Sequence, residues 1–166
     1  MDVMKMKLIF NNMKKEEAKE ISNWKYEEPY SIYSLDGSEE TIAEFMNGSY
    51  YFVYENNKLI GYFCFGESAQ IPVGKKYGVY DNENYIDIGL GLKPEMCGKG
   101  EGYNFVKAGL DYAKSIFIKN KFRLTVASFN KRAIKVYKKV GFEEIDYFTR
   151  KNKKGNINFI VMILDN

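Results

Sequence analysis

A short glycine-rich segment in the middle of the chain has the residue types and the spacing of an anion site. Gly98, Gly100 and Gly102 are spaced as G-x-G-x-G between an apolar stretch at 85–92 and an amphipathic stretch that begins at 103. The first N–H groups of a helix have no intrahelical acceptor and, with the helix dipole, attract anions, while glycines let a phosphate approach the main chain. The spacing differs from that of dinucleotide sites, and no G-K-[ST] sequence marks a P-loop. The segment therefore predicts a site for a phosphate-bearing ligand, with a tightly packed helix start as the alternative.

The composition excludes several classes of chemistry. None of the 166 residues is histidine, which excludes Ser-His and Cys-His catalysis and histidine metal sites, and we expect no metal. Cys64 and Cys97 are the two cysteines. We therefore expect no disulfide framework and a reducing, cytoplasmic setting. Charged residues make up 28% of the chain, and no apolar run has membrane-spanning length. The first residues lack the apolar core of a signal peptide, so we expect a soluble protein with no membrane partner.

The charge is divided unequally along the chain. Residues 1–84 hold nine Lys and fourteen Asp or Glu, a balance of −5, whereas residues 85–166 hold sixteen Lys or Arg and eight Asp or Glu, a balance of +8. This division suits two partners of opposite charge, and accidental surface charge is the alternative. Because the basic residues are dispersed and no recognition motif is present, nucleic acid is not expected as a partner.

Apolar periodicity divides the chain into alternating strands and helices within a single domain, 1–166. Strands are predicted at 3–10, 49–54, 59–65, 85–92, 122–127, 142–149 and 157–164, and helices at 14–21, 38–46, 103–117 and 130–139. Residues 24–33 form an aromatic connector and residues 66–84 a polar loop. The strand–helix–strand order over 85–127 calls for a parallel pair with a right-handed crossover inside an otherwise antiparallel sheet, so the predicted fold class is α+β.

A second motif places the glycine segment in a family. Leu92-Lys93-Pro94 precedes the glycines, and Asn130, Ala133, Tyr137 and Gly141-Phe142 follow as N-x-x-A-x-x-x-Y-x-x-x-G-F. In this order the two motifs resemble those of the GNAT acetyltransferase superfamily, whose acetyl-CoA loop is commonly R/Q-G-x-G-x-G/A. The resemblance is close over about residues 40–150. It implies a three-layer αβα fold with a mixed, mostly antiparallel central sheet, a parallel β-α-β core that binds acetyl-CoA, and transfer of acetyl to a primary amine.

The resemblance also implies which residues hold acetyl-CoA. The loop amides would hold the pyrophosphate, with Lys99 adding a positive charge. The long arm of coenzyme A would pair, like an added strand, with the free backbone groups of the strand before the loop. Asn130 would contact this arm, cap its own helix, or do both. The expected cofactor-binding residues are Leu90, Gly91, Leu92, Cys97, Gly98, Lys99, Gly100, Glu101, Gly102, Tyr103, Asn130 and Ala133.

Two residues are expected to carry the chemistry. The family's tyrosine at the position of Tyr137 gives a proton to the departing thiolate, and a core tyrosine on an apolar helix face is the alternative. An attacking amine must first lose a proton, because alkylammonium pKa values lie near 10. Asp87 is the expected base, directly or through water, and a solvated or paired strand aspartate is the alternative; Glu83 and Tyr85 are weaker candidates.

Two positions depart from the family pattern. Cys97 stands where Arg or Gln is usual, which removes a side-chain contact to the phosphates. A thiol at a helix N-terminus has a lowered pKa, but a catalytic role for Cys97 is the less favoured reading. Glu101 replaces an apolar residue between two glycines; it suits the helix dipole but repels phosphate unless it points away.

The acceptor is the least determined part of the prediction. The aromatic residues Trp24, Tyr26, Tyr30 and Tyr33 in the acidic half suit a cationic amine, with ordinary core packing as the alternative. A small amine and a peptide or protein amine both stay open, as do transfer of a longer acyl group and a non-catalytic acyl-CoA sensor. A homodimer is compatible with the sequence, which determines nothing more about oligomeric state.

Overall fold

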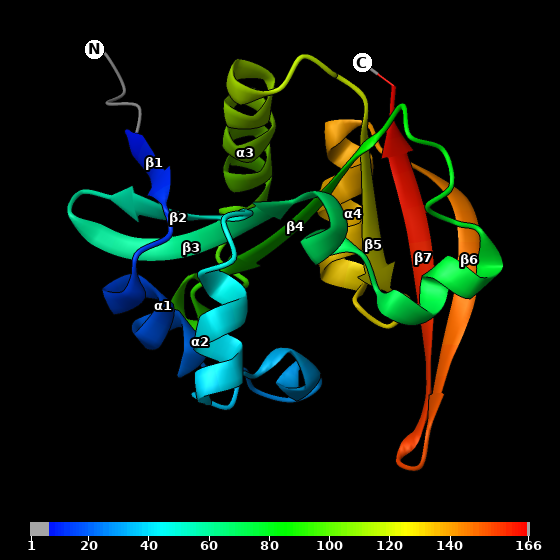
Figure 1. Ribbon diagram of the computed structural model, residues 1–166, viewed down its shortest axis with the longest axis horizontal. Coiled ribbons are helices and arrows are strands. Elements are labelled where there is room, and N and C mark those ends of the chain that lie inside the picture. The colour runs from blue at the N-terminus through cyan, green and yellow to red at the C-terminus, as the bar shows by residue number, and fades with distance from the viewer. Residues whose placement is uncertain (1–6, 166) are drawn as a thin grey trace. The chain divides into compact units, whose positions relative to one another are not determined.

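The computed structural model describes residues 7–165 (Figure 1). They form two compact units: the N-terminal unit, residues 7–64 and 90–97, and the C-terminal unit, residues 65–89 and 98–165. The strand β4 (Ile86–Leu92) begins in the C-terminal unit and ends in the N-terminal unit. The assignment of residues 1–166 to one domain stays a prediction.

The N-terminal unit is an antiparallel sheet with two short helices. Its elements are β1 (Leu8–Asn12), α1 (Lys15–Ser22), the 3-10 helix η1 (Ser31–Tyr33), α2 (Glu39–Phe45), β2 (Tyr50–Glu55), β3 (Lys58–Phe65, to Cys64 in this unit) and the 3-10 turn η4 (Pro94–Met96). β1 runs antiparallel to β2, and β2 to β3. The first strand thus ends two residues later than predicted, and residues 3–6 of the predicted strand lie outside the described residues.

Local sequence signals explain the turns of this unit. Asn56 and Asn57 join β2 to β3 with φ of 49° and 65°, the left-handed values that a two-residue type I′ hairpin requires and that Asn tolerates. The Oγ of Ser38 accepts a hydrogen bond from the N–H of Thr41 at 3.2 Å, which caps α2. Gly48, with φ of 96°, follows the end of that helix.

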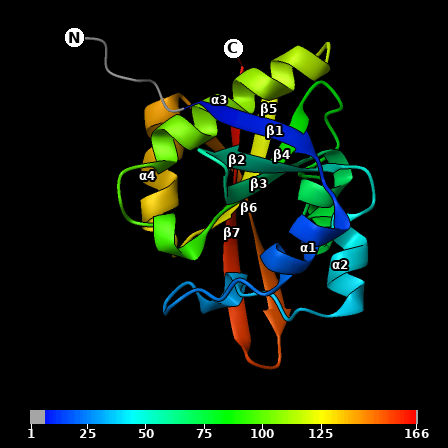
Figure 2. The same ribbon diagram turned by 90° about the vertical axis from the view of Figure 1, so that its left-hand side faces the viewer.

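The C-terminal unit contains the predicted β-α-β core. Its further elements are the 3-10 helices η2 (Gly66–Ala69) and η3 (Pro72–Tyr77), then α3 (Gly102–Ile116), β5 (Phe122–Ala127), α4 (Lys131–Val140), β6 (Glu143–Asn152) and β7 (Gly155–Leu164). β4 and β5 are parallel, with Asp87 opposite Arg123, and α3 lies between them in the chain. β7 runs antiparallel to both β5 and β6, and its hairpin with β6 is a long ribbon in both views (Figures 1 and 2).

The hydrogen-bonded strand order is β1-β2-β3-β4-β5-β7-β6, a mixed seven-stranded sheet. β4 and β5 are parallel, whereas the pairs β1–β2, β2–β3, β5–β7 and β6–β7 are antiparallel, which confirms the predicted α+β class and its parallel core. Within residues 7–165, none of the helices has the length and apolar character needed to cross a membrane.

The apolar stripe of α3 is buried along most of the helix. Phe105, Val106 and Leu110 are at most 3% exposed, as the 3.6-residue period predicts. Ile116 and Phe117, the last residues of the helix predicted at 103–117, are instead 41% and 36% exposed. The helix ends at Ile116, and both side chains reach a cavity at that end instead of the core.

Candidate functional site

The glycine segment of the C-terminal unit forms an exposed loop directly before α3. Gly98 and Gly100 have φ of 74° and 78°, a left-handed conformation that side chains disfavour. Both are exposed, and α3 starts directly after them at Gly102. A Cβ built on Gly102 would lie 3.2 Å from Cγ2 of Val136 in α4, so this glycine permits close packing of α3 on α4. The predicted loop and the predicted tight helix start are therefore both present, at different glycines.

A guanidinium that the sequence reasoning missed lies beside this loop. A Cβ built on Gly98 would lie 3.0 Å from Nη1 of Arg132, in the first turn of α4. Cys97 replaces the Arg or Gln expected before the loop, whereas Arg132 brings a positive charge beside the loop from α4. The available signal was a basic residue in the first turn of the second motif's helix, which gains meaning only when α4 lies beside the loop.

The second motif forms the helix α4 that the sequence predicts. Oδ1 of Asn130 accepts a hydrogen bond from the N–H of Ala133 at 3.2 Å, so Asn130 is the N-cap. Nζ of Lys139 lies 4.6 Å from the ring centroid of Tyr103, which brings a further cation to the first turn of α3. α3 and α4 are thus held together at the end that carries the glycine loop.

Tyr137 lies on α4 and is half-buried. Its ring meets that of Phe142 edge to face, with centroids 6.0 Å apart and planes at 64°. Its carbonyl oxygen accepts hydrogen bonds from the N–H groups of Gly141 and Phe142, at 3.1 and 3.0 Å, where α4 ends. Neighbouring Val136 packs on Gly102, so Tyr137 belongs to the part of the unit that carries the loop.

Asp87 is a buried carboxylate, and both of its oxygens accept hydrogen bonds. Its two oxygens accept hydrogen bonds from Nε and Nη2 of Arg123, at 2.7 and 2.8 Å, and Oδ2 also accepts one from Nε2 of Gln70 at 2.9 Å. The side chains of Asp87 and Arg123 are 5% and 3% exposed. Of the two roles that the sequence leaves open, base or paired strand aspartate, the structure describes the paired one. A carboxylate has about four acceptor positions, and three are occupied here.

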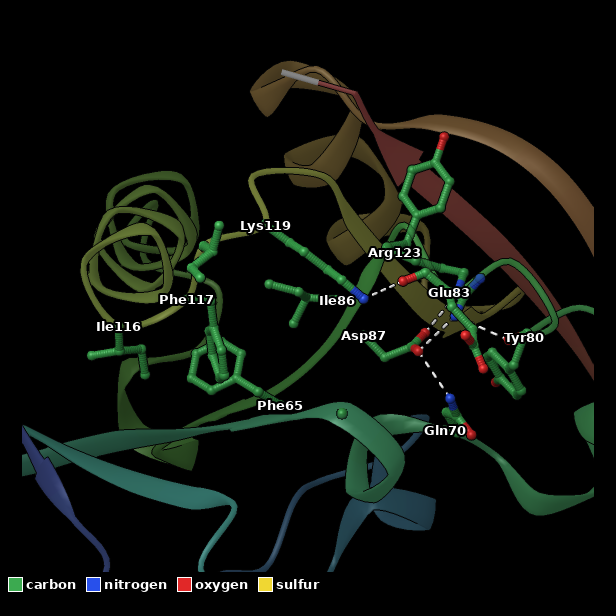
Figure 3. Close-up of a pocket in the computed structure, with 13 residues that line it drawn as sticks. Phe65, Gln70, Tyr80, Glu83, Ile86, Asp87, Ile116, Phe117, Lys119 and Arg123 are labelled. Carbon is green, nitrogen blue, oxygen red and sulfur yellow. Dashed lines mark hydrogen bonds and ion pairs between the residues drawn. The ribbon is translucent and has the colours of Figure 1, made fainter.

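A cavity of about 730 Å³ adjoins this ion pair (Figure 3). Asp87 and Arg123 form one part of its wall, and Phe65, Ile116 and Phe117 another. The cavity lies at the C-terminal end of α3, whereas the glycine loop precedes its N-terminal end. Fifteen helical residues at 1.5 Å each separate the two ends by about 22 Å. The cavity is therefore distinct from the glycine loop.

In the N-terminal unit, the end of β4 is engaged by neighbouring side chains. The hydroxyl of Tyr26 donates to the carbonyl of Leu92 at 2.7 Å, and Sγ of Cys97 lies 3.6 Å from the same oxygen. The carbonyl of Leu92, one of the residues predicted to pair with the coenzyme arm, therefore already accepts a hydrogen bond from within the N-terminal unit. The Cys97 thiol also donates to the carbonyl of Lys93 and follows η4, so it is not at a helix N-terminus as the sequence suggested.

The predicted aromatic residues divide between core and surface. Trp24 is only 6% exposed, and its ring lies 6.3 Å from that of Tyr62, which favours core packing for Trp24. Burial raises the pKa of Tyr26 far above its ordinary value of 10.0, and the nearby Tyr62, Cys97 and Glu95 raise it further. Tyr30 is half-buried and Tyr33 is 36% exposed at η1. Tyr26 is thus the predicted substrate residue that the structure brings to the end of β4.

Tyr62 is a residue that the sequence reasoning did not select. A Cβ built on Gly91 would lie 2.2 Å from Cε1 and 2.8 Å from the hydroxyl of Tyr62. Gly91 is therefore required by the tyrosine ring that packs on the backbone of β4.

Among the described residues, no cluster of three or more Cys, Asp or Glu side chains has the arrangement of a metal site.

Comparisons with known proteins agree with this geometry. The sequence model described as "Acetyltransferase (GNAT) family" matches residues 16–142. This chain therefore belongs to the GNAT acetyltransferase family. A search of curated proteins by sequence gives no match.

Solved structures support the fold. A GNAT-family acetyltransferase from Bacillus anthracis superposes with a TM-score of 0.72 at 16% identity, covering 96% of both chains. The spermidine/spermine N-acetyltransferase SpeG from Vibrio cholerae, in complex with manganese ions, has a TM-score of 0.66 at 19% identity, covering 95% of this chain and 91% of its own. The acetyltransferase yncA from Salmonella typhimurium, with its cofactor acetyl-CoA, has a TM-score of 0.62 at 18% identity, covering 95% and 93%. At these identities the likeness shows the fold alone.

Proposed function

We propose that this protein transfers the acetyl group of acetyl-CoA to a primary amine by direct attack of the amine on the thioester. The observation that carries the proposal is the left-handed glycine loop at the start of α3 with the guanidinium of Arg132 beside it. Together with Tyr137 on α4 and the family membership, this loop supports an acyl-CoA substrate over other phosphate-bearing ligands.

The residues of the loop suit the pyrophosphate of coenzyme A. A cradle of backbone N–H groups needs residues without a Cβ on the ligand side, and Gly98 and Gly100 supply them. Lys99 and Arg132 add positive charge, and guanidinium binds phosphate through paired hydrogen bonds. Glu101 lies at the N-cap of α3 with no side-chain capping bond, and in the proposal its carboxylate points away from the phosphates.

The chemistry needs one proton acceptor and one proton donor. When bound, acetyl-CoA supplies the thioester carbonyl; the new C–N bond forms as the C–S bond breaks. The phenol of Tyr137 gives its proton to the sulfur as it leaves and regains one from solvent. The amine gives up its own proton to water, because the carboxylate of Asp87 is held by Arg123 and Gln70. In this proposal Asp87 orients Arg123 between β4 and β5 instead of acting as the direct base.

The acceptor we propose is a cationic amine. The exposed acidic residues of the N-terminal unit support it, in the connector and around α2: Glu27, Glu28, Asp36, Glu39, Glu40 and Glu44. A similar structure is described as a spermidine/spermine N-acetyltransferase, which makes polyamines the first acceptors to try. Tyr26, at the end of β4, and Tyr30 and Tyr33, at η1, are proposed to contact the acceptor.

The test is release of free thiol from acetyl-CoA in the presence of a panel of polyamines, aryl-alkyl amines and peptides. Tyr137→Phe should lower kcat by about 10²–10⁴-fold, because a positioned acid contributes that much, and should leave binding of CoA unchanged. Tyr77→Phe removes an exposed phenol (54% exposed) and is the matched control. Saturable CoA binding without turnover on any amine would favour the sensor alternative. Absence of CoA binding would reject both functions.

A further inference from the structure

The cavity beside the Asp87–Arg123 ion pair lies away from the glycine loop. Its volume of about 730 Å³ is within the roughly 300–1,000 Å³ of small-molecule sites, and its lining residues all belong to the C-terminal unit (Figure 3). It lies at the C-terminal end of α3, about 22 Å from the end that follows the glycine loop. Its two walls differ in chemistry, and together they define what it can bind.

One wall is apolar and only partly covered by the protein. The ring of Phe65, at the end of β3, meets that of Phe117 edge to face, with centroids 5.4 Å apart and planes at 69°. Phe117 and Ile116 are 36% and 41% exposed, because α3 ends there and no further turn of helix covers them. A ligand with an aromatic or branched alkyl body would remove this apolar surface from water.

The other wall carries charges that cancel. Asp87 and Arg123 are at most 5% exposed and are joined by two hydrogen bonds. The other charged lining residues, Glu83 and Lys119, are exposed and also opposite in sign, and Nζ of Lys119 donates to the main-chain carbonyl of Glu83. The lining therefore has no net charge to offer an ion. A charged ligand would lose its hydration here without gaining a counter-ion of its own.

Hydrogen-bonding capacity nevertheless remains on this wall. A guanidinium has five N–H donors, and four of those of Arg123 are used, two by Asp87 and two by the carbonyl oxygens of Asn82 and Tyr80. One N–H on Nη1 is left over. Gln70 donates one N–H to Asp87, and within residues 7–165 its other N–H and its carbonyl oxygen make no hydrogen bond. The wall therefore keeps donors and an acceptor, the pattern that an uncharged amide complements.

We infer that this cavity is a binding site for an uncharged small molecule with an aryl-alkyl body and an amide end. The ligand's amide N–H donates to the carbonyl oxygen of Gln70, and its carbonyl oxygen accepts from the remaining N–H of Arg123. Its ring lies against the apolar wall of Phe65, Ile116 and Phe117. The site does not depend on the proposed acetyl transfer, and its test uses no acetyl-CoA.

Isothermal titration calorimetry with three probes that share a phenyl ring tests this site. N-phenethylacetamide is the uncharged amide, phenethylammonium the cation and hydrocinnamate the anion. The amide should bind saturably, with a Kd at least about tenfold below that of either ion, because only the ions give up the hydration of a charge. Gln70→Leu keeps a similar side-chain volume but removes the hydrogen-bonding groups, so it should raise the Kd for the amide about tenfold.

Two further variants test the apolar wall. Phe117→Ala should raise the Kd of the amide at least about fivefold, because the ligand's ring loses its main contact. Tyr147→Ala removes an exposed ring (63% exposed) from β6, outside the cavity, and is the matched control that should leave every Kd unchanged. Thermal unfolding shows which variants are folded, and Phe117→Ala decides alone if Gln70→Leu is not.

Three results would overturn the inference. If the amide does not bind saturably to the unaltered protein, the cavity is not a site for this class of ligand. If either ion binds as tightly as the amide, the polar wall does not select an uncharged group. If the folded cavity variants keep the Kd of the unaltered protein, the amide binds on another surface.

Discussion

The positive charge of Arg132 should contribute to CoA binding through the phosphates alone. Its Nη1 lies 3.0 Å from the position a Cβ on Gly98 would take, so a phosphate over the loop is within reach of the guanidinium. A hydrogen bond to a charged group contributes about 1.5–3 kcal/mol. Because Arg132 is exposed, solvent and salt reduce this contribution to the lower end, about 1.5 kcal/mol. Arg132→Ala should therefore raise the Kd for CoA roughly tenfold.

Isothermal titration calorimetry with two probes can separate this effect from general damage. CoA carries the phosphates, whereas pantetheine is the same arm without them, so Arg132→Ala should weaken only CoA. The loss should be larger at low salt, where charges are less screened. Arg132→Lys keeps the charge but loses the planar guanidinium, so its Kd for CoA should lie between those of the unaltered protein and Arg132→Ala. Lys107→Ala, which removes an exposed charge from the middle of α3, should change neither Kd.

Two results would refute the reasoning about Arg132. A change of less than twofold in the Kd for CoA at low salt would show that the guanidinium does not face the phosphates. An equal loss of CoA and pantetheine would show that Arg132→Ala disturbs the loop instead of removing a charge contact.

Three further changes test the geometry. Asp87→Asn leaves the buried guanidinium of Arg123 without its counter-charge and should lower the free energy of unfolding in urea by about 3–5 kcal/mol. Glu67→Gln removes one partner of an exposed ion pair and should leave the urea midpoint unchanged. Equal effects of the two variants would contradict the argument from burial. Gly91→Ala drives a methyl into a tyrosine ring and should cost about 1–3 kcal/mol by thermal unfolding; an unchanged midpoint would show that the ring moves freely. Gly98→Ala and Gly100→Ala both strain a left-handed residue, but only Gly98→Ala also displaces Arg132. Gly98→Ala should therefore raise the Kd for CoA more than Gly100→Ala does. Equal Kd values for the two variants would exclude a role for Arg132 beside Gly98.

Local signals made most of the elements predictable. Ser38 and Asn130 are recognisable as helix caps because the hydrogen bonds of a cap join residues three apart. The parallel order of β4 and β5 follows from a single helix between two apolar strands. The exposed end of α3 was missed because periodicity reports the face of a helix and not where its packing partner stops.

The site was predictable only in part. Gly98 and Tyr137 could be proposed from the sequence because they stand in motifs with fixed spacing. Arg132 was missed because its importance comes from a loop more than thirty positions earlier in the chain. The engagement of Asp87 was undecided because two strands 36 residues apart had to be paired in one register before Arg123 could lie opposite it.

The sequence by itself determined the class of the fold, the family and the two motifs from which the site is proposed. It could do so because caps, turns and periodicity depend on residues a few positions apart. Only the tertiary structure decided which charges stand at the loop, which carboxylate is paired, and that Tyr26 and Cys97 cover the carbonyl of Leu92. Such contacts depend on strand register and helix packing, which bring together side chains up to 66 residues apart.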